Sequence, residues 1–375
     1  MTIKAETKYF LISAFAAVLS ANILLIHVGM STQHGSEMLA YSAGAFIAWL
    51  IYTLIKQINQ VYVVLVSSGS VWLLVTIMVL IPFLFDLKPN ASIFLLFLSS
   101  LIFISATARL SSVPAIFSVE QRPFVARTIA VAAIFSLPVA SVVYGFLADY
   151  VFLLLSFIQA LSVLSFILLL RKLDEPHALK QTVTKETGKS EAVVHVSIMD
   201  RLVLVMETAL VMAPVGVAIT LFEVQRYQSD YSIYYVTAYF IALTVGVVFS
   251  KKAGQIEDRG FSLLCVLPAT MMLIAVYILH PGVSFMVFYI ISGGLVGVCI
   301  PLLQMKIYRE KNAASRALFS SDYSITRFAM PGVSGYFLHI GVNGNVNFLM
   351  LFVSVMVVLL IAYHVYSARQ SARCA

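Results

Sequence analysis

RKLDEPHALKQTVTKETGKSEAVVHVSIMDR, residues 171–201, is the only long hydrophilic run in a chain of 375 residues. It falls close to the middle, and the sequence on either side of it is apolar and broken only by short polar segments. Over the whole chain 61% of residues are hydrophobic and 11% are charged, whereas soluble globular proteins carry about 25% charged residues. The run therefore predicts a linker, 171–201, between two membrane-embedded halves, 1–170 and 202–375.

Apolar stretches long enough to cross a bilayer recur in both halves. A hydrocarbon core about 30 Å thick needs roughly 20 apolar residues in a helix. Six stretches precede the run 171–201 and six follow it: 9–30, 38–56, 61–86, 91–118, 124–148, 151–170, 202–223, 231–250, 261–280, 283–305, 316–340 and 346–366. The shortest break between them is Asp149-Tyr150. We therefore expect an all-α integral membrane protein whose twelve transmembrane helices form two six-helix bundles.

Lysine and arginine fall on one side of this arrangement. With the N-terminus inside and the sides alternating, the outer loops hold only Lys88 and Arg226. The inner segments hold the linker and Lys4, Lys8, Lys56, Arg122, Arg127, Lys251, Lys252, Arg259, Lys306, Arg309, Lys311, Arg316, Arg369 and Arg373. The positive-inside rule then predicts cytoplasmic termini in a multi-pass protein of the inner (cell) membrane. Because the basic residues line one membrane face, the net charge of +7 does not indicate nucleic acid as a partner.

Landmarks in the first half recur in the second half in the same order. Their offsets are nearly constant, at 187 to 195 residues, for the pairs Pro114 and Pro301, Arg122 and Arg309, Pro138 and Pro331, and Lys56 and Lys251. Two six-helix halves joined by a cytoplasmic linker are typical of a parallel duplication. The halves are therefore predicted to be related repeats.

The segment KKAGQIEDRG, 251–260, lies between the eighth and ninth predicted helices. Its Gly254, Asp258 and Arg259 resemble the glycine and aspartate-arginine signature of a cytoplasmic loop in the major facilitator superfamily, with one spacer before the last glycine missing. This resemblance implies that the three residues form a gating loop. The first-half segment KQINQ, 56–60, stands where the other copy belongs and has neither the glycine nor the aspartate.

Other helices carry degraded forms of motifs from the same superfamily. Arg109 is placed like the arginine of the helix-4 motif of proton-linked members. Leu137-Pro138 followed by Gly145 resembles the Gly-Pro motif of exporters, and PGVSG, 331–335, is similar to that pattern in the other half. With the 6+6 plan, these features resemble a proton-linked, exporter-like transporter of the superfamily.

Four ionisable residues lie within predicted helices: Arg109, Glu207, Asp322 and Arg327. A charge in the bilayer core is costly, so each is a functional candidate. Arg327 lies nearest the midplane and is expected to bind an anionic or polar group of a substrate. Arg109 is a second substrate-binding candidate, which can instead snorkel to the interface. The structural alternative for all four is an ion pair that locks helices together.

Proton coupling requires a group that exchanges between wet and dry surroundings. A carboxyl group in that position can bind and release one proton per cycle, and Glu207 and Asp322 are the predicted carriers. Asp322 and Arg327 lie five positions apart on one helix, about 140° around its axis, so each is expected to need another partner.

Three polar side chains within predicted helices are candidates for a substrate cavity: Asn22, Tyr239 and Gln304. Hydrogen bonding between helices explains them equally well. The glycine-rich segment 292–297 is interpreted as a close helix contact. The spacing of Cys265, Cys299 and Cys374 favours neither a disulfide framework nor a metal site, and no cofactor is expected.

These features favour a secondary active transporter that moves a small organic solute by alternating access, as a proton-coupled exporter (antiporter). Proton-coupled uptake of a nutrient such as a sugar or organic acid is an alternative, as is a non-transporting receptor on a transporter fold. A membrane enzyme is disfavoured, because the chain has no HExxH pair and no intramembrane nucleophile with an evident base. The expected partners are the substrate, protons and the lipid bilayer, and the chain is expected to be a monomer.

Overall fold

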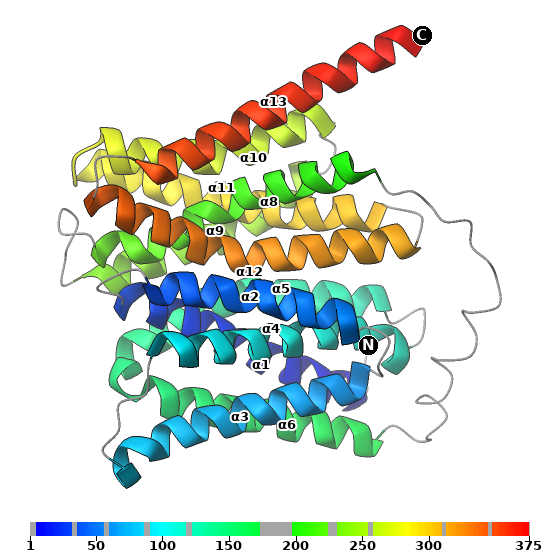
Figure 1. The fold of residues 1–375 in the computed structure, drawn as a ribbon, viewed down its shortest axis with the longest axis vertical. Helices are drawn as coiled ribbons and strands as arrows, with labels where there is room; N and C mark the ends of the chain where they lie inside the picture. The colour runs from blue at the N-terminus through cyan, green and yellow to red at the C-terminus, as the bar shows by residue number, and fades with distance from the viewer. Residues whose placement is uncertain are drawn as a thin grey trace. The chain divides into compact units, whose positions relative to one another are not determined.

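The computed structural model describes residues 5–31, 36–55, 60–85, 91–117, 122–172, 197–223, 231–253, 258–309, 313–343 and 347–374. Every secondary-structure element in these ranges is a helix (Figure 1). Lipid offers the backbone no hydrogen-bond partners, so an apolar run satisfies its own N–H and C=O groups by forming a helix. The predicted all-α architecture is confirmed.

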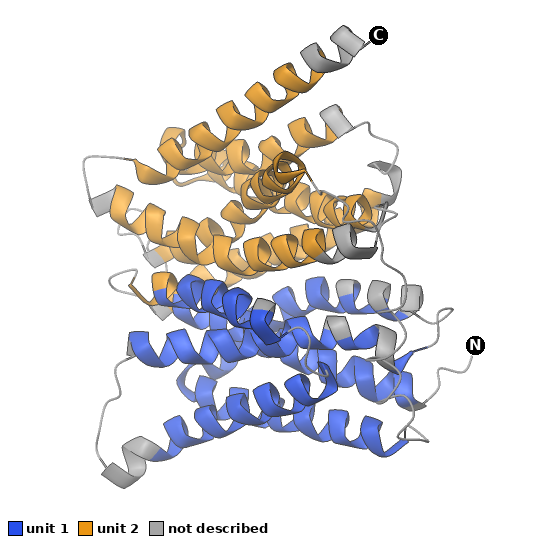
Figure 2. Ribbon diagram, turned by 45° about the vertical axis from the view of Figure 1, so that its right-hand side comes forward, with its two compact units in different colours: residues 1–28, 40–193 blue, residues 29–39, 194–375 orange. Residues whose placement is uncertain are grey.

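The chain divides into two compact units (Figure 2). The first comprises residues 1–28 and 40–193, and the second comprises residues 29–39 and 194–375. The helices of the first half are α1 (Ala5–Ser31), α2 (Ser36–Ile55), α3 (Gln60–Phe85), α4 (Ala91–Ile116), α5 (Arg122–Leu147) and α6 (Val151–Lys172). Within the first unit, α3 packs beside both α4 and α6.

The second half contains α8 (Ile198–Thr220), α9 (Ser232–Ala253), α10 (Asp258–Leu273), α11 (Val283–Arg309), α12 (Ala313–Asn343) and α13 (Phe348–Cys374). A short 3-10 turn, η2 (Leu221–Glu223), continues α8, and a π-helical turn, η4 (Ile274–Ile278), continues α10. In this unit α8 packs along α12, and α9 packs along α11.

These twelve long helices coincide with the twelve predicted stretches to within a few residues at most ends. The largest difference is at α13, which runs to Cys374 rather than ending at residue 366. The short break at 149–150 is a 3-10 turn, η1 (Ala148–Tyr150), that joins α5 directly to α6. The break in the sequence therefore corresponds to a change from α-helix to 3-10 helix over three residues.

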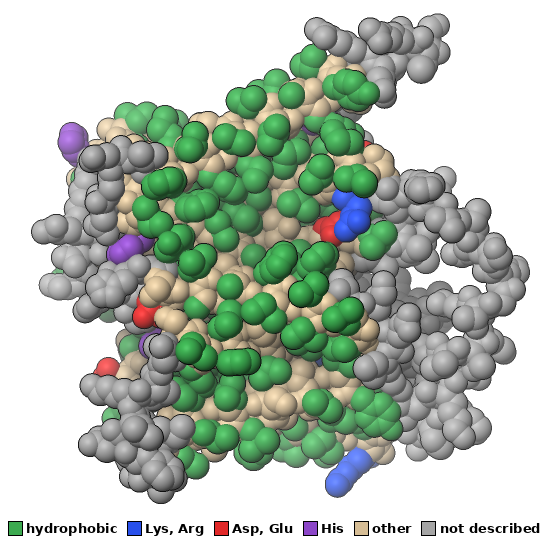
Figure 3. All heavy atoms as spheres, viewed as in Figure 1, with side chains coloured by type: hydrophobic (Ala, Val, Ile, Leu, Met, Phe, Trp, Pro, Cys, Tyr) green, Lys and Arg blue, Asp and Glu red, His purple; other side chains and the backbone are tan. Residues whose placement is uncertain are grey.

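Nine segments of the described chain are long and apolar enough to span a membrane. One of them, 131–172, is 42 residues long and covers the joined α5 and α6. Hydrophobic side chains cover much of the face drawn in Figure 3. Large apolar residues are strongly exposed, such as Phe146 at 84% and Val283 at 81%, which is expected of a surface that lipid surrounds.

Glycines allow two helix pairs of the second unit to approach closely. A Cβ atom at Gly297 of α11 would collide with the carbonyl oxygen of Leu243 on α9. A Cβ atom at Gly216 of α8 would collide with the carbonyl oxygen of Pro331 on α12. The contact expected for the glycine-rich segment 292–297 is therefore present, and its partner is α9.

Candidate functional site

Helix α8 positions three charged residues near its start, and neighbouring helices of the second unit pack around it. From Glu207 to Thr220 every residue of α8 is buried. Asp200, Arg201 and Glu207 each bind a side chain on another helix. The charges of α8 therefore serve contacts within the second unit.

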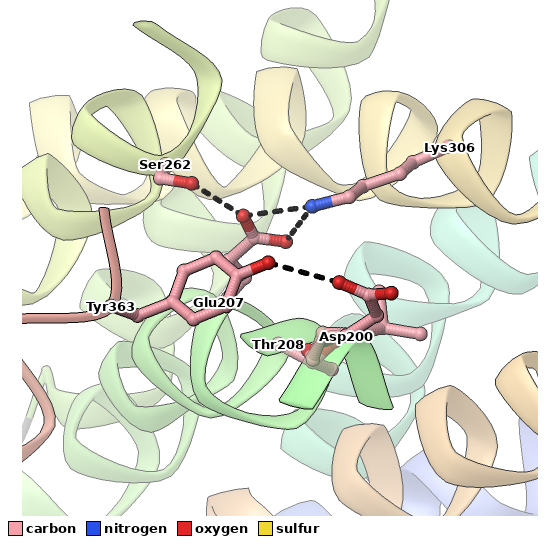
Figure 4. Close-up of polar contacts among 7 residues, drawn as sticks. Asp200, Glu207, Thr208, Ser262, Lys306 and Tyr363 are labelled. Atoms are coloured by element: carbon pink, nitrogen blue, oxygen red, sulfur yellow. Dashed lines mark hydrogen bonds and ion pairs between the residues drawn. The ribbon is translucent and has the colours of Figure 1, made fainter. Parts of the chain in front are cut away.

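Glu207 is fully buried, and three hydrogen bonds hold its carboxylate. Lys306 of α11 donates from Nζ to Oε2 at 2.8 Å and to Oε1 at 3.0 Å, and Ser262 of α10 donates to Oε1 at 2.6 Å. Figure 4 shows these side chains converging from their three helices. Because the ammonium group neutralises the carboxylate and both oxygens accept hydrogen bonds, the cost of burying the charge is offset.

Lys306 is the partner of Glu207, and the sequence pattern had assigned it to a cytoplasmic segment. The structure includes it in the last turn of α11, with its side chain 31% exposed and its Nζ directed inward to Glu207. Its hydrocarbon stem is long enough to carry the charge back along the helix. The available signal was that a buried carboxylate needs a cation, and Lys306 is the first charge after the apolar part of α11.

Asp322 of α12 is paired with Arg201 of α8. Arg201 donates from Nε to Oδ2 at 2.6 Å and from a terminal nitrogen to Oδ1 at 2.9 Å, which is the bidentate geometry that suits guanidinium and carboxylate. The expectation that Asp322 needs a partner other than Arg327 is met. Arg201 was placed at the end of the linker, but it lies inside α8. One residue earlier, Asp200 accepts a hydrogen bond of 2.9 Å from Tyr363 of α13 (Figure 4).

Arg109 of α4 is buried in the first unit, where serines from four helices surround it. Its Nε donates to Ser13 at 3.2 Å, and one terminal nitrogen donates to Ser68 at 2.9 Å and Ser162 at 2.7 Å. The other terminal nitrogen donates to the backbone carbonyl of Ser105 at 3.1 Å and to its hydroxyl. All five guanidinium donors therefore have protein acceptors. No carboxylate accepts from Arg109 in the part of the chain that the structure describes.

Arg327 lies near the middle of α12 and is half-buried. Its guanidinium lies 6.0 Å from the ring centre of the neighbouring Phe328. Within the described residues it has no ion pair and no side-chain hydrogen bond. Arg327 therefore differs from Arg109 and Arg201, whose donors are used by the protein.

Of the remaining predicted substrate contacts, Asn22 belongs to the first unit, and Tyr239 and Gln304 belong to the second. Asn22 donates to Ser136 at 2.6 Å and so links α1 to α5, whereas Gln304 is half-buried on α11. Tyr239 is fully buried, and its ring packs against Tyr289 with centroids 5.0 Å apart. Asn22 therefore makes the interhelical hydrogen bond that was the structural alternative.

The predicted gating loop lies mostly outside the described residues. Gly254 falls in the undescribed segment 254–257. Asp258 and Arg259 begin α10, and their side chains lie outside what the structure describes. The gating role of these three residues stays a prediction.

No protein-family model matches the chain, and no curated protein matches its sequence. Solved transporter structures match its fold over nearly the whole length. A POT family transporter in complex with a thioalcohol-conjugated peptide aligns with a TM-score of 0.67 at 11% identity, over 97% of this chain and 96% of that chain. The nucleoside transporter NupG aligns with a TM-score of 0.63 at 12% identity, over 97% and 99% of the two chains.

A third solved structure is a bacterial homologue of the human lysosomal transporter Spinster. It aligns with a TM-score of 0.60 at 13% identity, over 90% of this chain and 83% of that chain. At such low identity the likeness shows the fold alone. The chain is therefore an all-α, multi-pass membrane protein that shares its fold with these solved transporters. The exporter-like subtype suggested by the degraded motifs goes beyond this likeness.

Proposed function

We propose that this protein is a secondary active transporter that moves a small organic solute across the cell membrane by alternating access, coupled to protons. The observation that carries the proposal is the fully buried Glu207, bound by Lys306 and Ser262, within a fold shared with solved transporters. A charged side chain costs free energy when it is buried within the membrane, and ionisable groups found there often mark proton relays and ion pathways. Proton coupling would explain why the chain buries a carboxylate at that cost.

Glu207 is the proposed proton carrier. A proton on its carboxyl group removes the negative charge that binds Lys306, so protonation releases the lysine and deprotonation captures it. Lys306 is partly exposed whereas Glu207 is not, so the lysine is the member of the pair that can exchange contacts with its surroundings. Asp322 remains a second proposed carrier, and its protonation would remove the negative charge that supports its two hydrogen bonds from Arg201.

Arg327 and Gln304 are the proposed substrate contacts, because both are half-buried within helices of the second unit. Arg109 and Asn22 are assigned to helix packing, since serines already accept from their side chains. Tyr239 is fully buried and packs closely against Gly293 of α11, so it could reach a solute only if α9 and α11 separate. Export is favoured by the resemblance of the fourth and fifth predicted helices to motifs of proton-linked members and exporters.

Solved relatives of the fold support the size class of the solute. One solved structure is of a POT family transporter with 5-aminolevulinic acid, at a TM-score of 0.69 and 11% identity to this chain, and one is of a POT family transporter with a conjugated peptide. These ligands are small organic molecules that carry ionisable groups. Uptake of such a nutrient is the second candidate function.

A flux screen in proteoliposomes tests the proposal. The purified chain is reconstituted with a trapped fluorescent pH reporter, and small organic solutes are added outside one at a time. Proton-coupled transport predicts that a solute moves protons in protein-containing vesicles and not in empty liposomes. Movement of labelled solute without any proton movement would contradict the coupling. The sign of the proton flow shows whether protons move with the solute, as in symport, or against it, as in antiport.

A further inference from the structure

Two polar side chains lie one helical turn apart on α12, and neither forms a side-chain hydrogen bond or an ion pair within the described residues. The hydroxyl of Tyr323 is buried and has no hydrogen-bond partner among the described residues, although the residue is only 6% exposed. Arg327 follows four positions later, so the two side chains lie on the same face of the helix. A buried hydroxyl without a partner costs free energy, which a ligand that hydrogen-bonds to it recovers.

This face of α12 is directed toward α8 rather than toward lipid. Ser334 lies seven positions after Arg327 and eleven after Tyr323, which are rotations of only about 20° around the helix axis. Its hydroxyl donates to the carbonyl oxygen of Ala213 on α8 at 2.8 Å. Tyr323 and Arg327 therefore continue the stripe that packs on α8.

Hydrogen bonds between α12 and α8 lie on both sides of Arg327. Ser334 donates to Ala213 of α8, and Asp322 accepts from Arg201 of α8. Neither buried acid of this unit pairs with Arg327, because Glu207 is bound to Lys306 and Asp322 is bound to Arg201. Both buried carboxylates of the described chain are thus neutralised, and Arg327 is left as a cation without a protein anion.

We propose that Tyr323 and Arg327 form the recognition site for a carboxylate group on the transported solute. The planar guanidinium binds both oxygens of a carboxylate, and the phenol donates a third hydrogen bond to one of them. The substrate class is accordingly a small organic acid. The inference rests on the proposed transport function for its biological meaning, but the binding that it describes can be measured separately.

Ligand-induced stabilisation of the full purified chain in detergent tests this site. The probes are matched pairs that differ in charge: succinate with succinamide, benzoate with benzamide, and glycerol 3-phosphate with glycerol. The site predicts that at least one carboxylate raises the unfolding temperature in a saturable way while its amide does not. A phosphate that binds while neither carboxylate does would overturn the carboxylate assignment, and so would the absence of any anion-selective binding in the panel.

Variants locate the binding. Arg327→Gln is expected to abolish the carboxylate effect, and Arg327→Lys to retain a weaker one because it lacks the bidentate fork. Tyr323→Phe is expected to weaken affinity roughly tenfold, the usual effect of one hydrogen bond to a charged group. The matched controls are Arg171→Gln and Tyr62→Phe, at exposed positions of α6 and α3. Unchanged carboxylate affinity in Arg327→Gln would overturn the proposal even if Arg327→Lys fails to fold.

The same variants separate this inference from the transport proposal. Carboxylate binding that depends on Arg327, without any flux in vesicles, supports the site and contradicts transport. Proton-coupled flux of an uncharged solute that Arg327→Gln leaves intact supports transport and contradicts the site.

Discussion

Nζ of Lys306 lies 2.8 Å from Oε2 of Glu207 and donates also to Oε1, so the lysine on α11 neutralises a carboxylate that α8 buries completely. Ser262 on α10 completes the arrangement. Three helices of the second unit are thereby joined through one side chain. A change in the charge of Glu207 must alter the contacts among all three, which is the physical basis for assigning it the coupling role.

Removal of the lysine should expose the cost of the buried charge. Lys306→Met leaves Glu207 unpaired, and the expected loss of stability is about 3 kcal/mol, the lower end of the range for breaking a buried ion pair. The loss should shrink at acidic pH, because an unpaired buried carboxylate is relieved by taking up a proton. Unfolding in detergent, followed as a function of pH, measures both effects.

The double variant supplies the control for that prediction. Glu207→Gln combined with Lys306→Met removes both charges, so its stability should exceed that of Lys306→Met alone. The cycle compares the wild type, Glu207→Gln, Lys306→Met and the double variant. If the losses of stability in the two single variants simply add up in the double variant, the pair has no energetic coupling.

Arg201 and Asp322 should be coupled in the same way but more weakly, because the Asp322 side chain is 8% exposed whereas that of Glu207 is fully buried. Arg201→Lys keeps the charge and loses the two-pronged contact, so it is expected to destabilise the protein by about 1.5 kcal/mol. The loss in Arg201→Lys should disappear when Asp322 is already asparagine. Equal losses in the two backgrounds would contradict the bidentate pair.

Arg109 should behave as a structural residue of the first unit. Arg109→Lys replaces five fixed donors by three, and at least two serine acceptors lose their partner. The expected loss is about 2 kcal/mol of unfolding free energy, with the ligand affinity of the folded protein unchanged. An affinity that falls more than tenfold at wild-type stability would return Arg109 to the substrate site.

The close approach of α8 and α12 can be tested by adding a single methyl group at Gly216. Gly216→Ala places a methyl group against the backbone carbonyl of Pro331, which cannot move aside as a flexible side chain would. The expected cost is about 1–3 kcal/mol. Gly69→Ala on α3 is the matched control, since nothing lies within 4 Å of the added atom, and it should stabilise the protein by about 0.5 kcal/mol through helix propensity. Similar effects of the two substitutions would contradict the packing described for Gly216.

The helices could be predicted from sequence because apolar length alone determines where a chain can cross a bilayer. The partner of each buried charge could not be predicted in the same way. Lys306 follows the apolar stretch 283–305, so the sequence pattern assigns it to a loop. The structure places it in the last turn of α11, where its Nζ reaches Glu207. Ser262 is one serine among many, and no spacing distinguishes it.

Arg109 is a second residue whose partners could not be predicted from sequence. A lone arginine in an apolar helix suggests a ligand site because no acid is near it in sequence. Four serines from α1, α3, α4 and α6 satisfy its donors instead, and their convergence depends on tertiary packing. Arg327 is the candidate that we propose for solute binding, together with Tyr323, a neighbour that the sequence pattern did not distinguish.

The most direct test of the coupling role compares two kinds of flux in vesicles containing the Glu207→Gln variant, with Asp149→Asn as the exposed carboxylate control. Once the flux screen has supplied a solute, a pH gradient should drive its accumulation in wild-type and Asp149→Asn vesicles. In Glu207→Gln vesicles that accumulation should vanish, while exchange of labelled for unlabelled solute at equal concentrations continues. Gradient-driven accumulation at the wild-type level in Glu207→Gln would contradict the assignment of Glu207 as the proton carrier.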